Sequence, residues 1–190
     1  PHAVNVYAVF DNEEVGSNTK QGAMSTFLKD VLKRINSGLG YGIEEYNQAV
    51  SKSYLVSCDN AHAVHPNHPE LYDAENRAFM NKGIVIKEAA NQKYTTDAFS
   101  RAVFLEVCKK AGVPTQVFAN RSDKIGGSTL GNLSNTQVSV HALDIGIGQL
   151  AMHSNYETCG ALDTEYTVEA LKVFFDNNIS IDGANGFTIG

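Results

Sequence analysis

The sequence predicts an α/β fold with a three-layer α/β/α arrangement, in which helices flank a mostly parallel central sheet. Short apolar runs rich in Val, Ile and aromatic residues alternate with longer segments whose apolar residues recur at helical spacing. Glycine, proline and polar clusters separate these segments. With 190 residues, of which 43% are apolar, the chain can bury one substantial core, so we expect one domain portion over residues 1–190.

The first part of the chain is expected to contain two strands and a helix. Residues 3–10, AVNVYAVF, alternate in part and predict a buried strand that feeds into a polar cluster. A helix is predicted from about residue 18 to 35, ended by glycines. Residues 53–58, SYLVSC, predict a second strand, which delivers Asp59 into a loop.

The middle of the chain begins with an irregular stretch. Residues 60–82 contain two prolines and predict a long loop, which in a compact domain usually has a function or is disordered. A short strand is expected at 83–87. Thr96 can cap a helix that runs to Lys110 and is closed by a glycine and a proline, and residues 115–120 then predict another strand.

The last part is expected to contain a turn, a strand and a helix. Residues 126–129, GGST, predict a turn, and a short helical piece follows it. A strand is predicted at 138–145 and a final helix at 163–175. Because active sites of such folds gather where strands end, we expect acidic residues at several strand ends to converge.

Composition and charge exclude several classes of protein. No apolar stretch approaches the length of a membrane-spanning helix, and the first residues given do not show a basic segment followed by an apolar signal core, so we expect a cytoplasmic protein without a membrane partner. The three widely separated cysteines are expected to be reduced thiols. The net charge of −6, with scattered Lys and Arg, argues against a nucleic-acid partner.

Candidate chemistry is concentrated in carboxylates and histidines. Glu13 and Glu14 follow an apolar run, so one carboxylate could bind a metal while the other faces a substrate, although such pairs are also common on solvated surfaces. Three histidines at 62–68 have metal-like spacing, but the nearby prolines make a helix implausible and leave a polar loop as the alternative. A lone histidine such as His153 is more often structural than a ligand.

Five segments, taken together, resemble the aspartyl aminopeptidase family of zinc metallo-aminopeptidases, in the family's order and over most of the chain. They are FDNEEVGS at 10–17, SCDNAHAVHPN at 57–67, GIVIKEAANQKY at 83–94, RSDKIGGSTLG at 121–131 and DIGIGQLAMHS at 144–154. The resemblance implies a zinc-exopeptidase-like fold and an enzyme that removes an amino-terminal, acidic residue from peptides by attack of a metal-bound water.

The resemblance also implies roles for individual residues. Glu13 is expected to be the general base of a site with two zinc ions bridged by a carboxylate. Glu14 and His153 are expected to bind one ion, and Asp59 the other. Carboxylate oxygen and imidazole nitrogen suit zinc, and manganese or cobalt accept the same ligands.

Further residues are expected to face the peptide substrate. In the family a lysine and a tyrosine lie near the substrate, which here are Lys87 and Tyr94, and His62 is expected to line the pocket. A cationic Lys87 could pair with the acidic side chain at the amino terminus of the peptide. Ser128 and Thr129, in the glycine turn, are expected to help hold the substrate backbone.

The sequence departs from the family's pattern in two ways. One histidine ligand, an aspartate and the bridging carboxylate of the family lie upstream of anything equivalent to Pro1, and the family's inserted dimerisation domain is missing too. We therefore expect the carboxy-terminal portion of a catalytic domain, inactive alone, from a homo-oligomeric protein. After His153, Asn155 and Tyr156 stand where the family usually has an arginine close behind.

Two other functions remain open. The fold could serve as a non-catalytic binding or assembly module, which loss of Glu13, Glu14, Asp59 or His153 would favour, and all four are present. A related two-metal amidohydrolase acting on a non-peptide amide is the other possibility, and only a panel of substrates separates it from an aminopeptidase.

Overall fold

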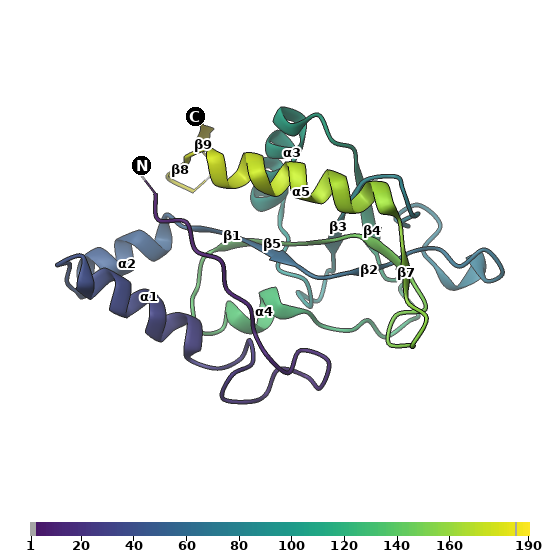
Figure 1. Cartoon of the computed structure of the whole chain (residues 1–190), viewed down its shortest axis with the longest axis horizontal. Helices are drawn as coiled ribbons and strands as arrows, with labels where there is room; N and C mark the ends of the chain where they lie inside the picture. The colour runs from purple at the N-terminus through teal and green to yellow at the C-terminus, as the bar shows by residue number, and fades with distance from the viewer. Residues whose placement is uncertain (1–2, 185) are drawn as a thin grey trace.

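This computed structural model describes residues 3–184 and 186–190, so Pro1, on which part of the sequence-based expectation rests, lies outside the described residues. The described residues form an α/β fold with mixed sheets. A four-stranded sheet has the order β1-β5-β3-β4. Its strands are β1 (Tyr54–Cys58), β3 (Ile84–Glu88), β4 (Thr115–Ala119) and β5 (His141–Gly146). Helices lie above and below this sheet in Figure 1.

The sheet is mixed rather than mostly parallel. β1 pairs in parallel with β5, and β3 in parallel with β4, but β3 and β5 are antiparallel. The expected parallel arrangement is therefore wrong for the central pair. An apolar run indicates that a strand is buried. It does not indicate which strand lies beside it or in which direction the two run, because these depend on contacts between distant segments.

Five α-helices are described. They are α1 (Phe27–Gly38), α2 (Ile43–Ser51), α3 (Ala98–Ala111), α4 (Leu130–Ser134) and α5 (Ala161–Asp176). In Figure 1, α3 and α5 cover one face of the sheet and α4 lies on the other. No helix within residues 3–184 and 186–190 is long and apolar enough to cross a membrane.

The ends of α3 follow from local sequence. Asp97 is its N-cap and accepts a hydrogen bond from the Ser100 N–H at 2.7 Å. Gly112 closes the helix with a positive φ of 68°, as the sequence predicted. The predicted cap, Thr96, is wrong by one residue, because its hydroxyl instead accepts from the backbone N–H of Asp144.

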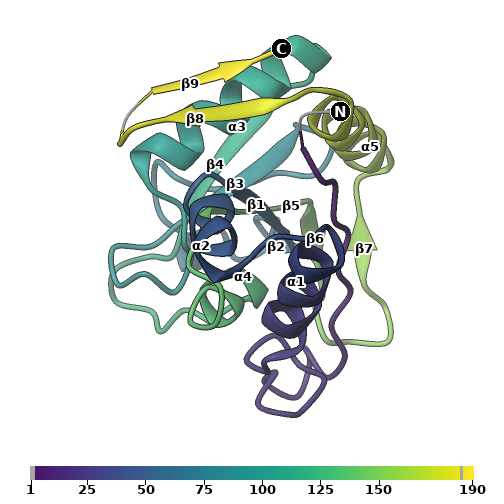
Figure 2. The ribbon, with the colours of Figure 1, turned by 90° about the vertical axis from the view of Figure 1, so that its left-hand side faces the viewer.

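Shorter strands complete the fold. β2 (Ala61–His62), β6 (Gly148–Leu150) and β7 (Thr158–Cys159) form a three-stranded sheet, and β8 (Ile179–Asp182) pairs with β9 (Gly186–Ile189). Figure 2 shows the β8-β9 hairpin beside α3, where the Phe187 and Phe99 rings meet edge to face at 5.9 Å. The loop expected over residues 60–82 is largely irregular, but it contains β2 and a 3-10 helix (Pro69–Leu71).

The amino-terminal predictions need correction. Residues 3–10 are extended but belong to no strand among the described residues, and Tyr7 is 83% exposed. Alternating apolar residues favour an extended backbone, but a buried strand also needs a neighbouring strand and a covered face. The predicted helix begins only at Phe27. Residues 18–26 form turns, and a Cβ at Gly22 would lie 2.2 Å from Ser17 O.

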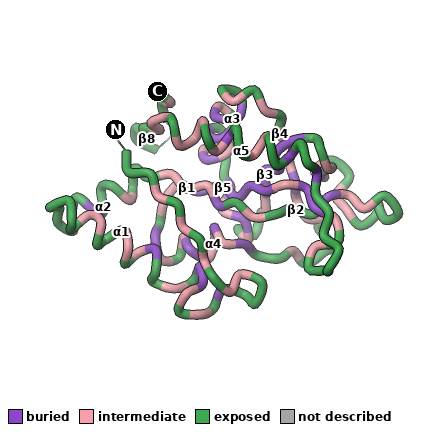
Figure 3. Tube along the Cα trace, viewed as in Figure 1, coloured by how far each residue is buried: buried purple, intermediate pink, exposed green. Residues whose placement is uncertain are grey.

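The two faces of β3 point into different surroundings. Ile84 and Ile86 pack against α3 and α5, in a cluster that includes Phe104 and Ala170. Val85 and Lys87 must face the other side, because side chains alternate along a strand. Figure 3 shows buried residues concentrated in the central strands and exposed residues in the outer loops. Lys87 is thus a charged residue within the central sheet, only 1% exposed.

Candidate functional site

Glu13 and Glu14 lie in a tight loop that follows the extended amino-terminal segment. Backbone hydrogen bonds from Ser17 N to Asn12 O and from Gly16 N to Glu13 O close the loop. Asn12 and Ser17 both have a φ of 60°, which is uncommon for residues other than glycine. The folded loop leaves Glu14 exposed and Glu13 half-buried, so both carboxylates can be reached.

His153, distant in the sequence, approaches this loop. Its Nε2 atom lies 3.0 Å from Oε2 of Glu14. His153 has a φ of 69°, and its backbone N–H donates to Oε1 of Glu157 at 2.7 Å. Ala151, two residues earlier, has a φ of 55°. Unfavourable backbone conformations of this kind cluster at functional sites, where surrounding contacts hold them in place.

Lys87 connects the central sheet to the loop after β1. Its Nζ donates to Asn60 O at 3.1 Å and lies 3.4 Å from Oδ2 of Asp59. The ammonium also lies 5.3 Å from the centre of the Tyr94 ring, within reach of a cation–π interaction. These contacts compensate for removing a charged side chain from water.

The pKa shifts place several of these groups within electrostatic range of one another. Burial raises the pKa of Glu13, and the charges of Asp59 and Glu14 raise it further, whereas Lys87 and His153 act in the opposite direction. A carboxylate with a raised pKa is a stronger base than an ordinary one. We call Glu13 and the four residues whose charges act on it, Glu14, Asp59, Lys87 and His153, the charged cluster.

His62 and Tyr94 belong to the same neighbourhood. Burial lowers the pKa of His62, and the nearby charges of His153 and Lys87 lower it further, which favours a neutral imidazole. Burial also raises the pKa of Tyr94, against an opposing hydrogen bond with Asn120. In both residues burial is the largest cause of the pKa shift.

The glycine turn that contains Ser128 and Thr129 is anchored in several ways. Lys93 donates to Gly126 O at 2.8 Å. The Ser128 hydroxyl donates to Oδ1 of Asn132 at 2.8 Å, and that of Thr129 donates to Oδ1 of Asp144 at 2.6 Å. Thr129 is buried, whereas Ser128 is exposed.

Two residues at this site were not singled out from the sequence. Asp144 is fully buried in β5, and Glu157 holds the backbone of His153. Asp144 could have been recognised, because a carboxylate inside the apolar run ALDIG must find hydrogen-bond donors when it is buried. No local pattern marks Glu157, since its role depends on the turn at His153.

The arrangement of donors was compared with the needs of a metal ion. No group of three or more His, Cys, Asp or Glu residues in the described parts of the chain is arranged to hold a metal ion. Glu14 and His153 nevertheless bring an oxygen and a nitrogen to 3.0 Å. Two ligands of a tetrahedral zinc ion, each bonded at about 2.0 Å, lie about 3.3 Å apart. The spacing of this pair therefore fits two positions of one zinc ion.

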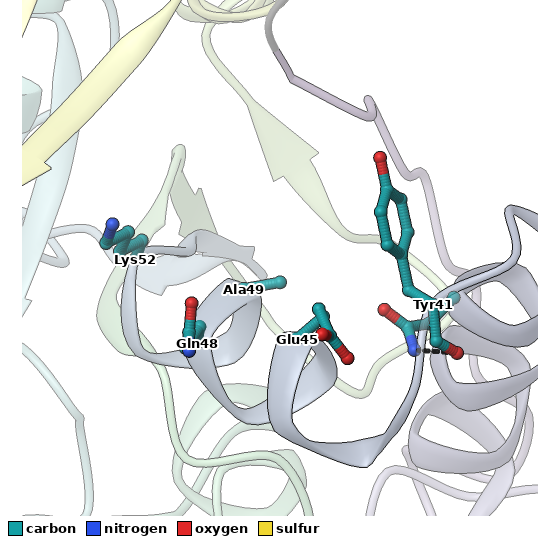
Figure 4. Close-up of a pocket in the computed structure, with 6 residues that line it drawn as sticks. Tyr41, Glu45, Gln48, Ala49 and Lys52 are labelled. Atoms are coloured by element: carbon teal, nitrogen blue, oxygen red, sulfur yellow. Dashed lines mark hydrogen bonds between the residues drawn. The ribbon is translucent and has the colours of Figure 1, made fainter.

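The hollow in Figure 4 is a separate feature of the surface. It is lined by residues of α1 and α2, by Tyr41 between the two helices and by Lys52 directly after α2. It shares no residue with the charged cluster.

Comparison with known proteins gives a consistent family match. Residues 1–175 match the family model described as aminopeptidase I zinc metalloprotease, M18. A probable M18 family aminopeptidase 2 of Clostridium novyi is 51% identical over 174 residues, which are 92% of this chain and 40% of that protein. Aspartyl aminopeptidase 1 of Schizosaccharomyces pombe is 43% identical over 179 residues, which are 94% of this chain and 38% of that protein. The chain therefore spans about two fifths of the length of these relatives.

Solved structures share the fold. A structure described as a complex of Ape4 and Nbr1 superposes with a TM-score of 0.85 at 44% identity, covering 87% of this chain and 31% of that chain. The mApe1 dodecamer of Saccharomyces cerevisiae superposes with a TM-score of 0.76 at 30% identity, covering 88% of this chain and 36% of that chain.

Proposed function

Because this chain belongs to the M18 family of aminopeptidase I zinc metalloproteases, we propose that the protein containing it removes an amino-terminal, acidic residue from peptides. The observation that carries the proposal is the meeting of Glu14 and His153 at 3.0 Å, beside a Glu13 carboxyl whose pKa is raised. The name of the relative from Schizosaccharomyces pombe, aspartyl aminopeptidase 1, supports an acidic residue as the one released.

Glu14, His153 and Asp59 are the proposed zinc ligands. The Glu14 and His153 donor atoms have a spacing that suits one tetrahedral ion, and Asp59 carries a carboxylate suited to a second. Bound zinc supplies an activated water and polarises the scissile carbonyl, and manganese or cobalt could occupy the same donors.

Glu13 is the proposed general base. Its half-buried carboxylate lies among Asp59, Glu14 and Lys87, and burial and the neighbouring carboxylates strengthen it as a proton acceptor. In the proposed reaction Glu13 accepts a proton from the attacking water and delivers it to the leaving amine.

Lys87 and Tyr94 are the proposed substrate contacts, with His62 beside them. An ammonium has three N–H donors, and Lys87 directs one to Asn60 O and lies near Asp59 and the Tyr94 ring. An acidic substrate side chain would give this cation a further partner. Ser128 and Thr129 are proposed to help hold the substrate backbone through the glycine turn.

The finer properties of the whole protein are also proposals. We propose that it is a cytoplasmic protein. We also propose that it is a homo-oligomer, since one matching structure is a dodecamer. The 190-residue chain alone is proposed to hydrolyse peptides poorly, because it supplies two donors for one ion and one for the other, and the relatives it matches are longer.

The test compares the complete protein with the isolated chain, each as wild type and as Glu13→Gln. Metal content and release of amino-terminal Asp and Ala from matched peptides are measured. We expect about two metals in the complete protein, faster release of Asp than Ala, and loss of activity with Glu13→Gln at unchanged metal content. Metal binding without release of any amino-terminal residue would overturn the proposed activity. Full activity of the isolated chain would overturn only the proposal that it is inactive alone.

A further inference from the structure

Asp144 is a buried carboxylate held entirely by backbone and hydroxyl donors. It is 0% exposed, and it takes part in none of the ion pairs formed by the described residues. Its Oδ2 accepts from the Thr95 N–H at 2.6 Å and from the Thr95 hydroxyl at 2.8 Å. Its Oδ1 accepts from the Thr129 hydroxyl at 2.6 Å. Both oxygens are therefore engaged, each by a different segment of the chain.

These two segments carry proposed substrate residues. Thr95 directly follows Tyr94, and Thr129 directly follows Ser128. Asp144 thus fixes both segments to the central sheet at one point. Without this carboxylate, neither Thr95 nor Thr129 has another side-chain hydrogen bond among those of the described residues.

Asp144 also lies close to Lys87. Lys87 and Asp144 are directly opposite each other in the β3-β5 pair. Side chains of directly opposite residues lie on the same face of a sheet. Gly131 closes the space around the carboxylate, because a Cβ there would lie 2.7 Å from Oδ1 of Asp144. The carboxylate therefore has little freedom to move, and the segments bound to it share its rigidity.

We propose that Asp144 is a positioning residue that couples the Thr95 and Thr129 segments and so sets Tyr94 and the glycine turn against Lys87. The effect on catalysis rests on the function proposed above, but the coupling does not. A charged acceptor with three short hydrogen bonds holds its donors more firmly than a neutral one. An amide in place of the carboxylate would turn an N–H group toward one of the donors, so Asn cannot satisfy all three.

The test uses three variants of the complete protein that contains this chain: Thr95→Val, Thr95→Ser and Asp144→Asn. Thr95→Val removes one hydroxyl donor to Asp144 and keeps the size of the side chain, whereas Thr95→Ser keeps the donor and is the matched control. Hydrogen exchange of residues 126–131 is measured, together with kcat and KM for a peptide with an amino-terminal Asp. Thr129 lies within residues 126–131 and is bonded to Asp144, which also binds Thr95, so exchange of this segment reports on the coupling itself.

We expect Thr95→Val to speed exchange of residues 126–131 about tenfold, to leave metal content unchanged and to raise KM more than it lowers kcat. Thr95→Ser should stay within about twofold of wild type in each respect. Unchanged exchange in both Thr95→Val and Asp144→Asn would overturn the coupling. Faster exchange in a protein that proves to have no aminopeptidase activity would support the coupling and refute only the function.

Discussion

The Nε2 atom of His153 lies 3.0 Å from Oε2 of Glu14, although the two residues are far apart in the sequence. Both belong to loops with left-handed residues: Asn12 and Ser17 flank Glu14, and His153 itself has a φ of 69°. Such conformations persist only where surrounding contacts hold them. Substitutions can therefore test which contacts hold His153 beside Glu14.

Replacing His153 by Ala is expected to weaken metal binding by at least about tenfold, because one of two adjacent donors is lost. His68→Ala is the matched control, since His68 is exposed and pairs with Glu70 away from His153. Metal affinity of the complete protein would be measured by titration against a chelator. Equal affinities of the two variants would remove His153 from the ligand set.

Glu157 is expected to influence the same site through the backbone. The His153 N–H donates to Oε1 of Glu157 at 2.7 Å, and Glu157→Ala removes this acceptor. Glu157→Gln keeps a carbonyl oxygen that can accept the same bond. We expect the Ala variant to lose roughly tenfold in metal affinity and the Gln variant to lose less, since partners that orient a ligand typically matter by that amount. A larger loss in Gln than in Ala would contradict this role.

Asp163 is expected to matter for stability rather than activity. This carboxylate is 0% exposed and accepts from Asn81 N at 2.6 Å and from Gly83 N at 2.8 Å. Asp163→Asn leaves one N–H facing another donor, which should lower the free energy of unfolding by about 1–3 kcal/mol. Glu165→Gln, an equal change of charge on the exposed side of α5, should alter it by less than about 0.5 kcal/mol. Urea denaturation of the two variants checks the difference.

From the surroundings of Tyr54 we expect the folded protein to lose stability at alkaline pH. Its hydroxyl donates to Ser100 O at 2.5 Å, and burial, followed by the charges of Asp97 and Cys108, raises the pKa of Tyr54 well above its ordinary value. The folded protein therefore binds the phenol proton more tightly than the unfolded chain does. The resulting stabilisation is fully present below about pH 10 and declines as the pH rises further.

Tyr54→Phe should remove that dependence. The variant is expected to lose about 1 kcal/mol of unfolding free energy at neutral pH, through the lost hydrogen bond. Its stability should then fall less steeply than that of the wild type above about pH 10. Urea denaturation of both proteins at several pH values measures this, and parallel curves would show that Tyr54 does not account for the alkaline decline.

The cysteines should differ in reactivity. Cys108 is buried in α3, and burial raises the pKa of its thiol to about 12, whereas Cys159 is exposed. Because the thiolate is the reactive form, iodoacetamide at about pH 8 should modify Cys159 and spare Cys108 until the protein is unfolded. Mass spectrometry of the alkylated peptides, with Cys159→Ser as control, measures the order. Modification of Cys108 at the rate of Cys159 in the folded protein would be inconsistent with this packing.

Much of the local structure follows from short-range patterns. The apolar runs before Asp59 and at 83–87 are strands, and α3 ends at Gly112, because the preference for an extended backbone and a left-handed helix end both depend on nearby residues. The family was also recognisable, since segments such as FDNEEVGS carry several specific residues in a fixed order. By contrast, α2 was missed, and of its residues only Tyr46 is buried, which leaves little apolar periodicity to detect.

Other features arise only when distant segments meet. Residues 3–10 have a strand pattern without a strand neighbour, and the antiparallel pairing of β5 with β3 cannot be read from either strand alone. Thr96 has a good capping side chain, yet Asp144 uses its hydroxyl and Asp97 caps the helix. The chain sequence specifies which groups can bond, whereas the choice among competing partners depends on the free energy of the whole packed fold, to which residues far apart contribute together.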